Sequence, residues 1–118
     1  MSPSLNIFIV ENHEDTLFHL ARYLEMRGHV VRSATTMAAA IRYLSQASPD
    51  VLISDIGLPD GDGWALMSGL SHPKPFGIAI SGYGTQADLR KSREAGFQHH
   101  LIKPFDPGEL DAVLAKAA

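Results

Sequence analysis

The sequence has no cysteine, no long apolar run and no excess of basic residues. The absence of cysteine excludes disulfides, thiolate metal sites and cysteine nucleophiles. Lys and Arg total 10 against 13 Asp and Glu, a net charge of −3, which argues against direct binding of nucleic acid through a basic face. The apolar runs are too short to cross a membrane, and residues 1–4 lack the basic and apolar regions of a signal peptide. We therefore expect a cytoplasmic protein that binds neither nucleic acid nor membranes.

The chain has the size and composition of one globular domain. Its 118 residues, of which 45% are hydrophobic and 19% charged, are too few for two ordinary domains and too apolar for a disordered chain. A chain of this length buries about 65% of its unfolded surface on folding, so it can form a hydrophobic core without disulfides or other cross-links. We expect one domain over residues 1–118.

Short apolar segments alternate with helical patterns five times. The expected strands are 5–10, 29–32, 51–54, 77–80 and 99–102. The expected helices begin near residues 14, 36, 63, 85 and 106. Short connections between alternating strands and helices favour a parallel sheet with helices on both faces, and the nearly continuous apolar strands agree with burial of both faces. The pattern predicts a doubly wound α/β domain.

Polar residues follow four of the five expected strands. Glu11 and Asn12 follow the first strand, Asp55 the third, Ser81 the fourth and Lys103 the fifth. In an open parallel sheet the carboxyl ends of the strands share one edge, where ligands bind. These side chains are therefore expected to meet, although they are far apart in sequence.

The residue types at this edge suit phosphoryl transfer. Two neighbouring carboxylates repel each other unless one is protonated or a cation lies between them, and a hard divalent ion such as Mg²⁺ prefers oxygen ligands. Lysine suits a phosphate oxygen, and aspartate can act as a nucleophile that forms an acyl phosphate. Asp55 is the preferred nucleophile because it lies centrally and its side chain is short. Taken alone, Asp55 would more often be a helix cap and Lys103 a solvated residue; their joint appearance with Ser81 favours the functional interpretation.

Other motifs are less specific. Gly82-x-Gly84 resembles part of a dinucleotide-binding turn, but no acidic residue follows at the expected distance, so a flexible turn is preferred. Asp60 and Asp62 suggest a calcium loop that lacks its final glutamate, and they are read as a surface turn, with a supplementary role at the metal site as the weaker alternative. A flavin-binding domain is a further, weaker alternative, because the turn after the first strand is acidic.

Four phrases together resemble the receiver domain of two-component response regulators. They are Ile-Val-Glu11-Asn12, Ile-Ser-Asp55-Ile-Gly-Leu-Pro59, Ile-Ser81-Gly and Ile-Lys103-Pro104-Phe105. The resemblance covers essentially the whole chain and implies a flavodoxin-like sheet with strand order 2-1-3-4-5. It further implies that Asp55 accepts a phosphoryl group from a phosphohistidine, with Mg²⁺ or Mn²⁺ as the cofactor.

The resemblance also assigns roles to other residues. By this likeness Glu11, Asn12, Asp55 and the backbone carbonyl of Gly57 are the metal ligands. Ser81 and Lys103 would contact the phosphoryl group, Ser81 and His100 would form the conformational switch, and the bond before Pro104 would be cis, well above the base rate of about 5–6%. The donor would be a histidine kinase or phosphotransfer protein. An output domain or partner would bind the face made by the fourth helix, fifth strand and fifth helix.

Two residues depart from the family pattern. Asn12 stands where the family usually has aspartate, which removes one charge and predicts weaker metal binding with phosphorylation retained. His100 stands where the family usually has tyrosine or phenylalanine, which weakens the apolar drive of the switch.

Three questions stay open at the level of sequence. The phrases around Asp60 and Tyr83 look like receivers of hybrid histidine kinases, so the chain is either a stand-alone regulator or part of a longer protein. A non-phosphorylated pseudo-receiver that serves as an interaction module is the alternative function, and homodimerisation is open. In either case we expect no enzyme that acts on external substrates.

Overall fold

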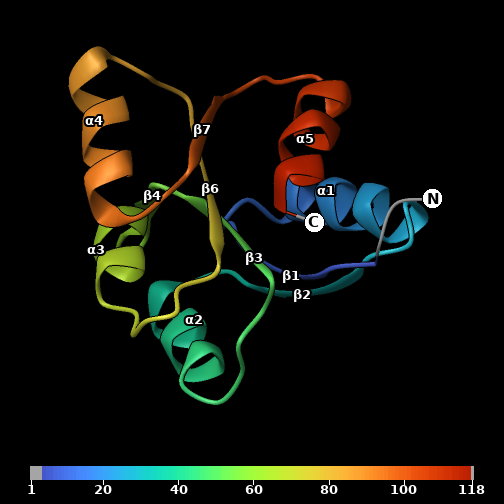
Figure 1. Cartoon of the computed structure of the whole chain (residues 1–118), viewed down its shortest axis with the longest axis horizontal. Helices are drawn as coiled ribbons and strands as arrows, with labels where there is room; N and C mark the ends of the chain where they lie inside the picture. Colours follow the sequence, from blue (N-terminus) through green and yellow to red (C-terminus); the bar gives the residue numbers. More distant parts are fainter. Residues whose placement is uncertain (1–3, 118) are drawn as a thin grey trace.

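A five-stranded parallel sheet forms the centre of the molecule (Figure 1). The structure is a computed structural model that describes residues 4–117. The strands lie in the order β2-β1-β3-β6-β7, with bounds Asn6–Val10 (β1), Val30–Ala34 (β2), Val51–Asp55 (β3), Phe76–Ser81 (β6) and His99–Ile102 (β7). Two short strands outside this sheet, β4 (Gly57–Leu58) and β5 (Gly61–Asp62), come before β6 in the chain, so the order equals the predicted 2-1-3-4-5. The predicted doubly wound fold is confirmed.

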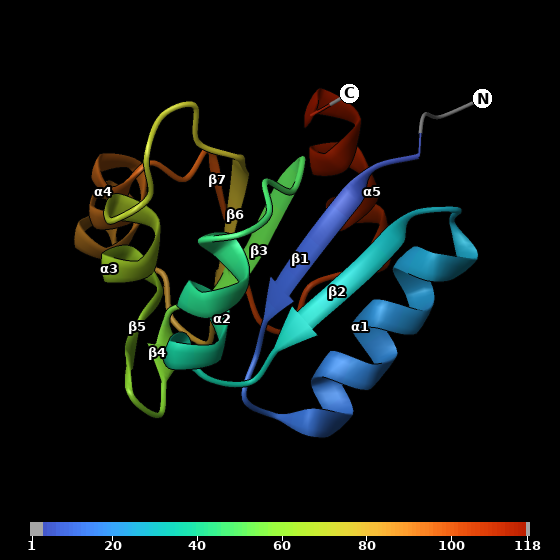
Figure 2. The ribbon, with the colours of Figure 1, turned by 90° about the horizontal axis from the view of Figure 1, so that it is seen from below.

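Helices cover both faces of the sheet. The helices are α1 (Glu14–Met26), α2 (Met37–Leu44), α3 (Gly63–Ser68), α4 (Gln86–Ala95) and α5 (Pro107–Leu114), the last of them followed by a 3₁₀ turn, η1 (Ala115–Ala117). Helices α1 and α5 lie on one face and α2, α3 and α4 on the other (Figures 1 and 2). Within residues 4–117, none of these helices combines the length and apolar character that a membrane span requires.

Alternate residues of the strands divide the core between the two faces. In β1, Ile7 and Ile9 pack on the side of α1 and α5, whereas Phe8 and Val10 pack on the side of α2 and α3. The ring of Tyr43 from α2 stacks on Phe8 with centroids 4.2 Å apart. Because both faces are dry, the strand has no polar alternation, which explains its continuous apolar sequence.

Local signals set the start and end of the helix nearest the predicted switch. Helix α4 begins with a capping box, in which Thr85 Oγ1 accepts a hydrogen bond from the Asp88 N–H and the Asp88 carboxylate accepts one from the Thr85 N–H. The helix ends at Gly96, which adopts φ 118°. These residues set the two ends of α4, which follows β6 and precedes β7 in the chain, as the sequence predicts.

Two segments differ from the expected boundaries. The turn-rich segment after β3 forms a small antiparallel hairpin of β4 (Gly57–Leu58) and β5 (Gly61–Asp62). Strand β2 extends through Ala34, beyond the predicted end at residue 32, because its residues pair along the whole of β1. Its polar residues are tolerated because β2 is an edge strand.

Candidate functional site

Four predicted site residues lie at the carboxyl edge of the sheet. Glu11 directly follows β1 and Lys103 directly follows β7, while Asp55 and Ser81 are the last residues of β3 and β6. Because β3 lies at the middle of the sheet, Asp55 has a neighbouring strand end on either side. The parallel register thus gathers side chains separated by up to 92 residues.

Lys103 joins the two acidic residues directly. Its Nζ lies 2.6 Å from Glu11 Oε1 and 2.9 Å from Asp55 Oδ2. The Glu11 residue is fully buried and Asp55 is 6% exposed. Both ion pairs are therefore largely shielded from water, where charge-assisted hydrogen bonds are strong.

The three groups perturb one another's protonation. Burial raises the pKa of Asp55, and the charge of Glu11 adds to this effect, while the hydrogen bond from Lys103 offsets it only in part. Burial also opposes ionisation of Glu11, but hydrogen bonds from Lys103 and the His13 backbone outweigh it and lower the pKa of Glu11. Burial opposes the charge of Lys103 too, yet its hydrogen bonds to the two carboxylates raise its pKa. The surroundings thus favour the charged forms of Lys103 and Glu11 and disfavour the charged form of Asp55.

Backbone groups fix the remaining carboxylate oxygens. The Gly57 N–H donates to Asp55 Oδ1 at 3.2 Å, and the His13 N–H donates to Glu11 Oε2 at 3.1 Å. These bonds orient Asp55 and Glu11 from the loops that follow their strands. The short β4–β5 hairpin thus begins at the residue that holds the aspartate.

The donors at this edge fit a divalent cation. Ligating atoms of Glu11, His13 and Asp55 lie within 4.8 Å of one another. The amide oxygen Oδ1 of Asn12 is buried and has no hydrogen-bond partner among residues 4–117, so its lone pairs are available to coordinate a cation. Two carboxylates and an amide oxygen suit Mg²⁺ or Mn²⁺. The exposed imidazole of His13 lies 3.1 Å from Glu11 Oε2, a contact that was not anticipated from the sequence.

Ser81 faces a second cluster through His100. The Ser81 hydroxyl hydrogen-bonds to the carbonyl oxygen of Tyr83, and Ser81 Oγ lies 2.7 Å from His100 Nε2. The other ring nitrogen of His100, Nδ1, lies 2.7 Å from Ser92 Oγ. Ser92 Oγ in turn accepts a hydrogen bond of 2.8 Å from the indole N–H of Trp64. The predicted pair of Ser81 and His100 is thus in contact, whereas Ser92 and Trp64 were not anticipated, since only the packing of α3 on α4 brings them together.

The acidic residues of the turn have capping roles. The Asp60 carboxylate accepts hydrogen bonds from the N–H groups of Met37 and Ala38 at the start of α2, at 2.7 and 3.0 Å. Asp62 Oδ1 accepts one from Ala65 in α3 at 2.7 Å. These contacts account for both carboxylates outside the cluster of Glu11 and Asp55. The bond between Lys103 and Pro104 is cis, as the family resemblance implied.

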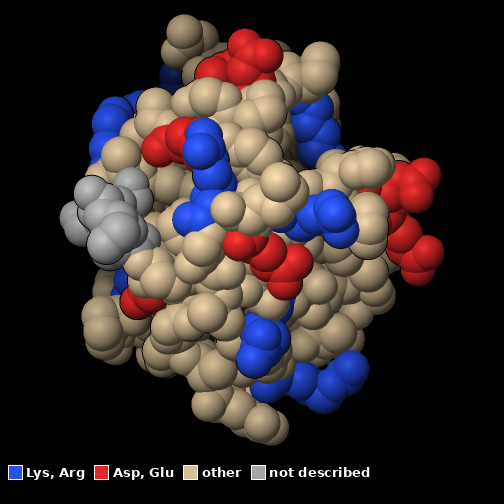
Figure 3. Space-filling model, turned by 90° about the vertical axis from the view of Figure 1, so that its right-hand side faces the viewer, with Lys and Arg blue, Asp and Glu red and all other residues tan. Residues whose placement is uncertain are grey.

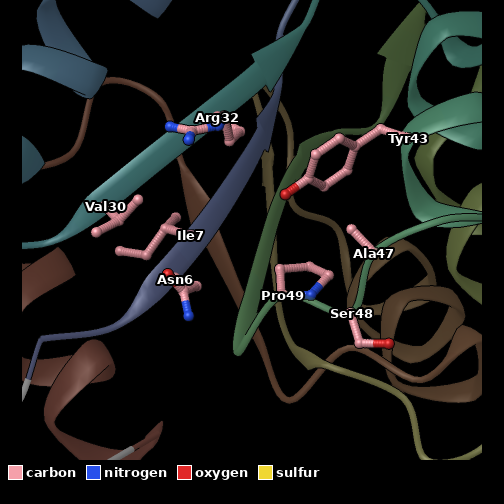
Figure 4. Close-up of a pocket in the computed structure, with 8 residues that line it drawn as sticks. All are labelled: Asn6, Ile7, Val30, Arg32, Tyr43, Ala47, Ser48 and Pro49. Atoms are coloured by element: carbon pink, nitrogen blue, oxygen red, sulfur yellow. The ribbon is translucent and has the colours of Figure 1, made fainter.

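A hollow in the surface lies away from these residues. Figure 4 shows a pocket of about 230 Å³ at the amino-terminal ends of β1 and β2. Its lining residues are Asn6, Ile7, Val30, Arg32, Tyr43, Ala47, Ser48 and Pro49. None of the predicted site residues is among them. The chemistry-bearing groups gather at the opposite edge of the sheet, as expected for this topology.

Comparison with known proteins agrees with this arrangement of fold and site. The family model of the response regulator receiver domain matches residues 7–115. The chain belongs to this family.

Similar proteins come from several bacteria. An uncharacterised 14.6 kDa protein in the sodA1 3′ region of Leptolyngbya boryana is 32% identical over 90% of this chain and 84% of its own length. The KDP operon transcriptional regulatory protein KdpE of Escherichia coli is 34% identical over 95% of this chain. The chain spans only 50% of KdpE.

Solved structures share the fold closely. A putative response regulator from Chloroflexus aurantiacus has a TM-score of 0.89 at 27% identity, covering 98% of both chains. A response regulator from Burkholderia pseudomallei, solved with a phosphorylated aspartic acid, a calcium ion and citrate, has a TM-score of 0.85 at 25% identity. This similarity covers 92% of the present chain and 65% of that one. Phosphorylation-based signalling is therefore the function of the family to which the chain belongs.

Proposed function

We propose that this domain accepts a phosphoryl group on Asp55 from a phosphohistidine and passes the signal to a partner by a conformational change. An oxygen of the Asp55 carboxylate attacks phosphorus, the P–N bond to the donor imidazole breaks, and the imidazole nitrogen takes up a proton. The product is an acyl phosphate on Asp55. The observation that carries the proposal is the buried Asp55 carboxylate held 2.9 Å from Lys103 Nζ.

Each neighbouring group has a defined task in this reaction. Lys103 supplies a positive charge to the transferred phosphoryl oxygens, and the Ser81 hydroxyl donates a hydrogen bond to one of them. Glu11, Asn12, Asp55 and the Gly57 carbonyl would hold the metal ion. A bound Mg²⁺ or Mn²⁺ supplies charge neutralisation between the carboxylates and the phosphoryl group.

We infer that the phosphoryl donor and the partner that receives the signal are both proteins. The donor is a histidine kinase, in the same polypeptide or a separate one, or a phosphotransfer protein. The output domain or partner binds the face of α4, β7 and α5. Figure 3 draws the side of the molecule where α1 and α5 lie, and basic and acidic side chains are interspersed on it. Together with the net charge of −3, this favours a protein surface as partner over the phosphates of nucleic acid.

Asn12 is the observation that favours a second candidate, a pseudo-receiver without phosphorylation. The amide contributes no negative charge, so the site has one carboxylate fewer to balance a divalent cation. In that case the domain would serve only as an interaction module.

Intact-mass spectrometry separates the two candidates. The protein is incubated with acetyl phosphate and Mg²⁺, with Asp55→Asn as the test variant and Asp62→Asn, whose carboxylate caps α3, as the matched control. We expect one added phosphoryl group in the wild type and in Asp62→Asn, and none in Asp55→Asn or with EDTA. Absence of the adduct at every donor and metal concentration would favour the pseudo-receiver.

A further inference from the structure

We propose that His100, held by Ser92 and Trp64, is a positioning residue that sets the direction of the Ser81 hydroxyl and couples it to the surface between α3 and α4. The inference rests on the proposed role of Ser81 at the phosphoryl group. It is carried by three side-chain hydrogen bonds that connect Trp64, Ser92, His100 and Ser81 in one chain.

The indole at the outer end determines the direction of hydrogen-bond donation. Tryptophan has only a donor, so Ser92 Oγ must accept from Trp64. Ser92 is 2% exposed, and its own proton is satisfied when it donates to Nδ1 of His100. This arrangement assigns the His100 proton to Nε2.

The same direction of hydrogen-bond donation continues to Ser81 at the carboxyl edge of the sheet. The Nε2–H group of His100 donates to Ser81 Oγ, and the Ser81 hydroxyl donates to the carbonyl oxygen of Tyr83. All donors in this chain run from Trp64 toward Tyr83, and each polar side-chain atom along the way has at least one partner. A phenyl or phenol ring at position 100 has no pair of nitrogens and cannot connect two hydroxyl groups in this way.

Ser81 has a single proton to donate. When its hydroxyl donates to a phosphoryl oxygen on Asp55, it releases the Tyr83 carbonyl oxygen. His100 Nε2 already lies 3.3 Å from that oxygen, which is therefore a ready alternative acceptor. The chain thus has two arrangements, in which the proton of His100 is directed at Ser81 or at Tyr83.

The second arrangement changes the surroundings of Trp64. His100 lies on β7, Ser92 on α4 and Trp64 in the first turn of α3, so a small turn of the imidazole acts on the contact between two helices. Lys91 Nζ lies 5.0 Å from the Trp64 ring centroid, and Lys91 is exposed. The phosphorylation state would therefore be read at the surface between α3 and α4 as well as at the proposed partner face.

Nuclear magnetic resonance of the full chain tests both parts of this inference. In the unphosphorylated wild type, long-range ¹⁵N–¹H spectra should show the proton of the His100 ring on Nε2 and none on Nδ1. Addition of Mg²⁺ and beryllofluoride should then displace the Trp64 indole N–H signal, which is readily assigned because Trp64 is the only tryptophan. A proton on Nδ1 would overturn the inference, and this arm needs no variant.

Variants of Ser92 test the coupling itself. In Ser92→Ala, beryllofluoride should still displace the backbone amide signal of Gly57 but no longer that of the Trp64 indole. Ser92→Thr, which keeps the hydroxyl, should restore the indole response, and the matched control Ser68→Ala on α3 should leave it unchanged. An undiminished indole response in Ser92→Ala would overturn the coupling. A wild type in which even Gly57 fails to respond would contradict the proposed function, while the tautomer of His100 would still decide the hydrogen-bond chain.

Discussion

Lys103 Nζ lies 2.9 Å from Asp55 Oδ2 although 48 residues separate the two in sequence. The same nitrogen lies 2.6 Å from Glu11 Oε1, so one cation serves two buried carboxylates. When both carboxylates are ionised, Lys103, Glu11 and Asp55 together carry a net charge of −1 that is largely shielded from water. This net charge affects the stability of the folded protein and the affinity of the site for cations.

The raised pKa of Asp55 predicts that Asp55→Asn stabilises the protein at neutral pH in the absence of metal. The native state keeps the Asp55 proton at pH values where the unfolded chain, with a pKa of about 3.9, has lost it. The contribution of Asp55 to stability therefore falls as the pH rises through that window. Urea unfolding at about pH 4 and about pH 7 should show an advantage of Asp55→Asn that grows with pH. A constant difference at the two pH values would contradict this linkage.

Removal of the shared cation should destabilise the site. Lys103→Met leaves Glu11 and Asp55 without their partner, and we expect a loss of about 2 kcal/mol at neutral pH, since Lys103 is partly exposed. The double variant with Asp55→Asn should recover most of this loss, because only one carboxylate then needs a partner. A double-mutant cycle from chemical denaturation measures the coupling between Lys103 and Asp55, and additive effects of the two substitutions on the free energy of unfolding would refute it.

The lone amide of Asn12 predicts weak metal binding. Asn12→Asp should bind Mg²⁺ at least about tenfold more tightly, or about 1.4 kcal/mol, because it adds a carboxylate beside Glu11 and Asp55. Calorimetric titration at fixed ionic strength measures this directly. Equal affinities for the two proteins would show that Asn12 is not a ligand.

The sequence predicts the topology and the edge of the sheet that carries the site. Apolar runs that end at Glu11, Asp55 and Lys103 define the strands, and the winding of a parallel sheet then brings their ends together. The fine structure of the site depends on packing instead. The contact of His100 with Ser92 and Trp64 arises where α3 meets α4, and no periodicity in the sequence encodes that contact.

The capping roles of Asp60 and Asp62 show a related limit. Asp60 binds backbone N–H groups of α2, which begins 23 residues earlier in the sequence. An acidic turn and a distant helix N-terminus could be matched only once the fold was known. The role of Asp60 could therefore not be decided from the sequence, because it depends on where the turn lies relative to α2 in the folded protein.

Close packing behind Asp55 predicts that replacement of Gly63 destabilises the protein. A Cβ atom at Gly63 would lie 2.6 Å from the backbone oxygen of Asp55, whereas one at Gly57 would meet nothing within 4 Å. Gly63→Ala should therefore lose about 1–3 kcal/mol of stability, a cost typical of overpacking. The matched variant Gly57→Ala should stay within about 0.5 kcal/mol of the wild type in thermal or urea unfolding. Similar losses for both variants would contradict the packing argument.

Identification of the phosphorylated residue tests the account most directly. The protein is treated with acetyl phosphate and Mg²⁺, reduced with borohydride, which converts an aspartyl phosphate to homoserine, and digested for tandem mass spectrometry. The account predicts homoserine at position 55 in the wild type and no homoserine at any position in Asp55→Asn. Homoserine at another aspartate, or none in the wild type, would contradict it.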